Sequence, residues 1–348
     1  MLQRFGLLLV VMALVVLPVM GCSGGSVTSR SIEMVPERAN MLGQVNLAKI
    51  LTDEDLTELY DKTPKDPANP QTFEEALDNL KDDYDIDLMD FNDIVFFGDT
   101  SESADEEGTT NFALIVEGTF DKDDLLAAIE DAAAEGETEL ESTDYKGYEM
   151  HMFEDEDGAF VFLSDKMLVI GTMEWVKEVI NVAKGDGKAL SGVVLDTYNN
   201  MGDVLIKVAV ETMAPGQAEE KLPGEMGDLL GDMSAFEDVK TVGLTLDKKG
   251  NSIAIAMKMC VADSESAEGL QEAIDGLIGI IGFAASMSEN AEENEALLSL
   301  LEEIDVSQSG SCVDVELEMA LLEIEEYLET GTSGIDGTNV PWFGGFGE

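Results

Sequence analysis

Residues 139–171 read ELESTDYKGYEMHMFEDEDGAFVFLSDKMLVIG, and this stretch decides the predicted fold class. It contains four runs with strand character, separated by short polar turns. The runs are Glu139–Thr143, Tyr148–Phe153, Ala159–Leu163 and Met167–Gly171, and the turns are Tyr145-Lys146-Gly147, Asp155-Glu156-Asp157-Gly158 and Ser164-Asp165-Lys166. Strands joined by tight turns run in opposite directions, so the stretch predicts an antiparallel meander.

Further elements are predicted on the N-terminal side of this meander. The strands are expected at 41–47, 94–98 and 112–118, and the helices at 53–61, at 72–84 and after Asp121. Asp121 is a good helix N-cap, and Leu125, Ile129 and Ala133 follow it at helical spacing. A helix at 173–183 closes this part of the chain.

The C-terminal part of the chain repeats this theme loosely. Strands are expected at 204–210, 239–246, 252–261 and 311–319, and helices at 267–286, 292–303 and 321–328. This order of strands and helices along the chain predicts an α+β fold with antiparallel meander sheets, helices packed on one face, and two similar halves. We expect a first α+β domain at 33–190, a second at 191–330 and a Gly-rich tail at 331–348.

The N-terminus has the features of a secretory signal peptide. Arg4 precedes an apolar run that starts at Phe5, and small residues follow the run. Residues 5–20 number only 16. The run is therefore shorter than the roughly 20 residues that a membrane-spanning helix needs.

Val19-Met20-Gly21-Cys22 resembles the lipobox of prokaryotic lipoproteins. The resemblance implies that residues 1–21 are removed and that Cys22 becomes the acylated first residue. Residues 22–32 are rich in Ser and Gly, which predicts a flexible tether. We therefore expect the protein on the extracytoplasmic face of the cell membrane, held to membrane lipid through acylated Cys22.

The layout also resembles that of extracytoplasmic lipoproteins of unknown function, in which an early strand is followed by a meander and a helix. The segments that carry this resemblance are 35–45, 112–126 and 168–172. It implies no activity.

The chain is strongly acidic. It has 74 Asp and Glu against 19 Lys and Arg, which gives a formal net charge of −55. Such a field repels nucleic acid and anionic head groups from the folded part and attracts counterions. The acidic residues are therefore interpreted as a solvated shell.

The sequence offers few residues for catalysis or for metal and cofactor binding. His151 is the only histidine, so multi-histidine metal sites are excluded. Strand alternation places it beside Glu149 and predicts an ordinary surface histidine. Asp85, Asp87, Asp90 and Asp93 lack the spacing of an EF-hand loop. We expect no catalytic residue, metal or cofactor.

Cys260 and Cys312 are expected on the polar faces of their strands. Cys260 alternates with Lys258 on one side, and Cys312 alternates with Asp314. A buried structural cysteine normally lies on an apolar face. In an exported protein, two cysteines on polar faces favour a disulfide over two free thiols, although the strand register is unknown.

The predicted helix at 267–286 contains a stretch, 277–285, that is apolar on every side. One interpretation is complete burial between the sheet and another helix. The other is an apolar surface for a ligand or partner, formed by Leu277, Ile278, Ile281 and Phe283.

These features together predict a membrane-anchored extracytoplasmic lipoprotein with a non-catalytic binding or structural role. Its partner would be an apolar small molecule or an envelope protein. The alternatives are the solute-binding component of a transporter and, after it, a cell-envelope hydrolase. Against the transporter component, the chain shows hairpins rather than repeated βαβ units.

Overall fold

The computed structural model describes residues 30–63, 70, 72–84, 86–100, 112–135, 138, 140–153, 157–212, 234–287 and 298–325. Cys22, the signal peptide and the tail at 331–348 lie outside these residues. The predictions made for them therefore stay predictions.

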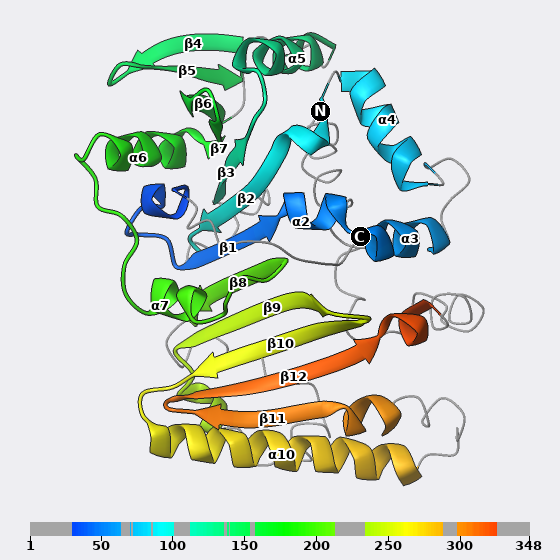
Figure 1. The fold of residues 1–348 in the computed structure, drawn as a ribbon. Helices are drawn as coiled ribbons and strands as arrows, with labels where there is room; N and C mark the ends of the chain where they lie inside the picture. The colour runs from blue at the N-terminus through cyan, green and yellow to red at the C-terminus, as the bar shows by residue number, and fades with distance from the viewer. Residues whose placement is uncertain are drawn as a thin grey trace.

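The described part of the chain forms a single antiparallel sheet of 12 strands, in the order β11-β12-β10-β9-β8-β1-β2-β3-β7-β6-β5-β4 (Figure 1). The strands are β1 (Met41–Asn46), β2 (Phe91–Gly98), β3 (Phe112–Gly118), β4 (Leu140–Tyr145), β5 (Tyr148–Phe153), β6 (Gly158–Ser164), β7 (Met167–Thr172), β8 (Ile206–Glu211), β9 (Thr241–Lys249), β10 (Ser252–Cys260), β11 (Ile304–Ser309) and β12 (Cys312–Ala320). The predicted α+β class with an antiparallel meander is confirmed.

The helices are α2 (Leu47–Thr52), α3 (Glu54–Lys62), α4 (Phe73–Tyr84), α5 (Lys122–Glu135), α6 (Met173–Ala183), α7 (Val193–Asn199), α9 (Ser234–Glu237) and α10 (Ser264–Met287). Two short 3-10 helices, η1 (Ile32–Met34) and η2 (Leu88–Asp90), precede β1 and β2. Residues 298–302 and 321–325 are also helical.

The meander β4–β7 folds as its turns predict. Tyr145 pairs with Tyr148, so a two-residue turn joins β4 to β5. Lys146 and Gly147 have φ values of 54° and 81°. This left-handed pair is the geometry that matches the twist of a tight hairpin, and glycine adopts it without steric cost.

The two expected halves of the chain join through β1 and β8. From this pair outward, one side reads β1-β2-β3-β7 and the other β8-β9-β10-β12. On each side a long helix, α5 or α10, follows the third strand. Because β1 and β8 are antiparallel, the topology of the halves is related by an approximate twofold rotation about an axis through the sheet.

Helices pack on both faces of the sheet, whereas the sequence alone predicts one face. In β2, Ile94 belongs to a core under α2–α5, while Val95 and Phe97 belong to a second core under α6 and α7. Alternate side chains of a strand point to opposite faces, so a strand that is apolar on both faces needs a cover on each. Figure 1 shows α3 and α4 on the right of the sheet and α6 and α7 on the left.

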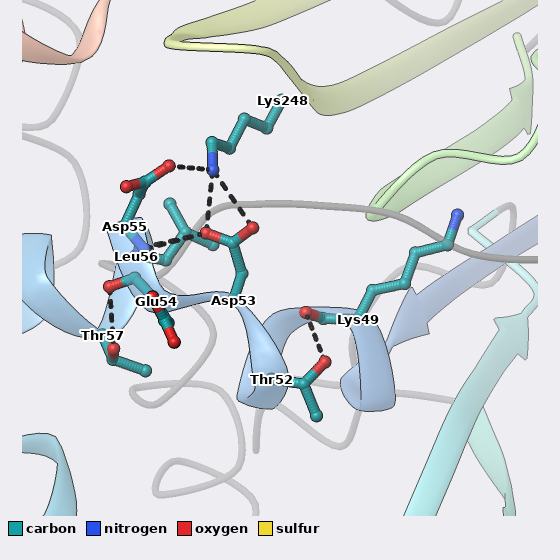
Figure 2. Close-up of polar contacts among 8 residues, drawn as sticks. All are labelled: Lys49, Thr52, Asp53, Glu54, Asp55, Leu56, Thr57 and Lys248. Atoms are coloured by element: carbon teal, nitrogen blue, oxygen red, sulfur yellow. Dashed lines mark hydrogen bonds and ion pairs between the residues drawn. The ribbon is translucent and has the colours of Figure 1, made fainter.

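A buried ion pair ties the second half of the sheet to α3 (Figure 2). The Lys248 Nζ lies 2.9 Å from Asp53 Oδ1 and also donates to Asp55. The Lys248 side chain is only 5% exposed. Burial alone would lower its pKa, but the hydrogen bonds to Asp55 and Asp53 raise the pKa above the usual lysine value.

Asp53 has a second role that fixes its position, since it caps the N-terminus of α3. Its Oδ1 accepts from the backbone N–H groups of Asp55 and Leu56 at 3.1 and 3.3 Å. One carboxylate thus starts a helix of the first half and binds the lysine of the β9–β10 hairpin.

We predict that Lys248→Met lowers the free energy of unfolding by about 2–4 kcal/mol, because a nearly buried carboxylate loses its cation. The control is Lys249→Met: the Lys249 side chain is 45% exposed and pairs with Glu316, so its loss should cost less than about 1 kcal/mol. Urea unfolding at neutral pH measures both. Equal losses would show that the Lys248 contact adds nothing beyond a surface pair.

Candidate functional site: an exposed apolar helix

Helix α10 lies along β11 at the lower rim of the sheet (Figure 1). It starts at an N-cap, because Asp263 Oδ1 accepts from the backbone N–H groups of Glu265 and Ser266 at 3.1 and 2.9 Å. These bonds lower the pKa of the Asp263 carboxyl. The helix therefore begins three residues earlier than the apolar pattern predicts.

One side of α10 is buried against the sheet. Ala267, Leu270 and Ile274 recur at helical spacing and pack on Met259 and Val313, which are paired on β10 and β12. Ile278 extends this contact in a half-buried position. This side fixes the helix to the sheet, and it uses mainly the N-terminal half of the helix.

The opposite side of the C-terminal half is exposed and apolar. Phe283 is 67% exposed and Met287 is 70% exposed, and Ile280 lies one turn before Phe283. Cβ atoms added to Gly276 or Gly279 would meet nothing within 4 Å. We call Gly276, Gly279, Ile280, Phe283 and Met287 the outer surface of α10. Their spacing places them on one side of the helix.

Charge is distributed unevenly along α10. The acidic residues Glu265, Glu268, Glu272 and Asp275 all precede the outer surface, and residues 276–287 contain no charged residue. By length and composition alone, α10 is long and apolar enough to cross a membrane, and only 18% of its most apolar stretch is buried.

The four residues predicted for an apolar surface do not share one side of α10. Ile278 faces the sheet, Leu277 is half-buried, and Ile281 and Phe283 are exposed. Complete burial, the other interpretation of this stretch, is wrong, because no described element covers the outer surface. Leu298 and Leu301 approach the helix on another side, at Gly282.

Two further exposed apolar residues lie on the sheet face that α10 covers in part. Leu244 on β9 pairs with Met257 on β10, and these side chains are 44% and 38% exposed. Val315 and Val306 continue this row toward α10. The alternation of both strands indicated the apolar face, but it gave no sign that the middle of that face would be exposed.

The structure pairs Cys260 with Cys312 in a disulfide, at directly opposed positions of β10 and β12. Both lie on the polar face, next to the pair formed by Lys258 and Asp314. The bridge spans 52 residues. Closing a loop of that length stabilises the fold by about 4 kcal/mol in the chain-entropy treatment.

His151 is buried, and the prediction of a surface position is wrong. It is 4% exposed, its ring stacks on Phe160 with centroids 4.7 Å apart, and its Nδ1 lies 2.9 Å from Ser142 Oγ. Alternation placed it correctly on the face of Phe153, but that face belongs to the core under α5. Burial lowers the pKa of His151, against the opposite effects of Glu149 and Glu130.

A polar chain that the sequence analysis did not predict lies next to the β1/β8 junction; Tyr198 and Lys207 are buried in it, and Gln44 and Asp93 are half-buried. Tyr198 on α7 donates to Gln44 Oε1, and Gln44 Nε2 donates to Asp93 Oδ1 at 2.8 Å. Lys207 Nζ lies 3.9 Å from the Tyr198 ring centroid. Burial raises the pKa values of Tyr198 and Asp93 and lowers that of Lys207. These hydrogen bonds join α7, β1 and β2 next to the junction.

The described residues contain no group of three or more His, Cys, Asp or Glu side chains placed to hold a metal ion. Of the aspartates noted in the sequence, Asp87 binds Lys81 and caps η2, while Asp93 binds Gln44. Asp85 lies outside the described residues.

No protein-family model and no curated protein matches this chain. The solved structures that resemble it include crystal forms I, III and IV of TP0453, with TM-scores of 0.42, 0.43 and 0.42 and sequence identities of 9, 8 and 10%. The alignments cover 85, 85 and 86% of this chain and 94, 96 and 96% of those chains. A similarity of this size identifies neither a family nor a function.

We predict a proton-linked loss of stability at His151. The pKa of His151 in the folded state lies below the ordinary value of 6.5, so folding favours the neutral ring. The contribution of this ring to the free energy of unfolding is therefore complete above pH 6.5 and decreases as the pH falls below it. His151→Phe keeps an aromatic ring against Phe160 but cannot titrate. Between about pH 7 and about pH 5, the wild type should therefore lose more unfolding free energy than this variant does.

Urea unfolding at several pH values measures this difference, and the carboxylates that both proteins share cancel in it. A difference that stays constant with pH would show that the folded state does not depress the pKa of His151.

Proposed function

We propose that this chain is a lipid-anchored extracytoplasmic protein with a non-catalytic role, and that it binds an apolar partner through the outer surface of α10. Two independent features support the proposal. The first is the lipobox-like sequence Val19–Cys22, which favours acylation of Cys22. The second is the exposure of Phe283 and Met287 on α10.

The exposure of Phe283 and Met287 is the observation that carries the proposal. Both side chains remain about two-thirds exposed on a helix whose other side packs well. Grouped apolar residues on a polar surface mark contact sites for partners, ligands or membranes. In a chain of net charge −55, a charge-free stretch of this length is a marked departure from the surrounding composition.

The chemistry of the same surface favours binding over catalysis. Catalysis needs polar groups that converge on the reacting atoms and stabilise the charge that develops there. The outer surface of α10 contributes glycine, isoleucine, phenylalanine and methionine. The only histidine is enclosed beside Phe160, where a substrate has no direct access.

The anchor is tested by labelling cells that express the full chain with a radioactive fatty acid. We expect label on the wild type and none on Cys22→Ser, because the thiol is the acylation site that the lipobox defines. The control is the double variant Cys260→Ser, Cys312→Ser, which removes the other two cysteines and should keep the label. Label on Cys22→Ser would refute the anchor.

The apolar surface is tested with Nile red, an uncharged dye whose fluorescence rises on apolar contact. We expect the double variant Phe283→Ser, Met287→Ser to lose most of the fluorescence that the native protein induces. Met89→Ser is the matched control, since Met89 is 50% exposed in η2 and lies in the other half of the chain. An unchanged signal in the double variant would show that α10 offers no binding surface.

A further inference from the structure

We infer that the occupant of the outer surface of α10 is a lipid bilayer whose head groups carry no net charge, on which the last three turns of the helix lie. The inference rests on the proposed function and names the partner of the same surface.

The inner side of α10 prevents the helix from spanning a membrane while the fold is intact. Ala267 and Leu270 are fully buried, and Ile274 is nearly so, against Met259 and Val313. Insertion across a bilayer would remove this cover from the sheet. A helix with one side packed on protein and the other side apolar can instead lie in the plane of the interface.

The distribution of charge limits lipid contact to residues 276–287. Glu268, Glu272 and Asp275 are exposed on the preceding turns, and they would meet head groups if the whole helix lay flat. The contact is therefore formed by the C-terminal half, in which Phe283 and Met287 are the most exposed apolar side chains. The neighbouring carboxylates make a negatively charged membrane unfavourable.

The shape and charge of this surface argue against a soluble ligand and a second copy of the chain. Small-molecule sites are concave, whereas α10 lies at the lower rim of the sheet (Figure 1), where Cβ atoms added to Gly276 or Gly279 of the outer surface would meet nothing within 4 Å. Two copies would bring chains of −55 charge together. A bilayer of zwitterionic lipid adds no like charge, and an acyl group on Cys22 would hold the chain beside it.

The test uses the mature chain expected after cleavage, residues 22–348, with Cys22→Ser, so that neither the acyl anchor nor the apolar signal peptide contributes to binding. Vesicles of phosphatidylcholine are mixed with the protein and floated on a density gradient. We expect the protein to float with the vesicles. Adding Phe283→Ser and Met287→Ser should weaken binding at least tenfold, and adding Met89→Ser should leave it unchanged.

The lipid composition and the salt concentration provide the second readout. Replacing part of the phosphatidylcholine with phosphatidylglycerol should reduce binding, and sodium chloride should restore it by screening the repulsion. Stronger binding to the anionic vesicles would overturn the inference, because an electrostatic contact would then dominate.

Three other results would also overturn the inference: no flotation with phosphatidylcholine, equal flotation of the Phe283→Ser, Met287→Ser variant, and a dimer in sedimentation that this variant abolishes. The last result would assign the surface to a second copy of the chain. None of them affects fatty-acid labelling at Cys22. Failure of this inference is therefore distinguishable from failure of the anchor.

Discussion

Strand β1 is hydrogen-bonded along both of its edges, and the rest of the structure depends on that pairing. Its residues pair with β2 on one side and β8 on the other, so the two halves of the chain form one continuous sheet. The side chains of this strand alternate between two cores, with Leu42 under α7 and Val45 under α2. The polar chain from Tyr198 through Gln44 to Asp93 adds specificity at this junction, since a shift of register would remove the partner of the buried Tyr198 hydroxyl.

Positive charge is scarce in this chain, and three of the described cations, Lys248, Lys49 and Arg38, lie where separate segments meet. Lys248 joins the β9–β10 hairpin to α3, and Lys49 joins α2 to Asp203 ahead of β8. Arg38 lies 3.9 Å from the Trp175 ring centroid and pairs with Glu174 and Glu178 of α6. An acidic chain repels itself, so each cation has its largest effect where it offsets that repulsion between packed elements.

The two sides of helix α10 have different roles in the structure. Its inner side completes the core at the end of the second half and keeps the helix on the sheet. Its outer side carries the exposed apolar residues on which the proposed function rests. The disulfide between Cys260 and Cys312 joins β10 to β12, and α10 lies between these two strands in the sequence, so the helix belongs to the loop that the disulfide closes.

The sequence by itself determined the α+β class and most elements, because period-two and helical patterns record which side of each element is apolar. It also placed Cys260 and Cys312 on polar faces, although only the register of β10 and β12 made them neighbours. It missed β11, whose two apolar residues, Ile304 and Val306, form too short an alternation to stand out. Alternation assigned His151 to the correct face, but whether α5 covers that face depends on how distant segments pack. The same is true of α10: composition shows that 277–285 is apolar, and only the tertiary structure decides which of its sides lies against protein and which lies in solvent.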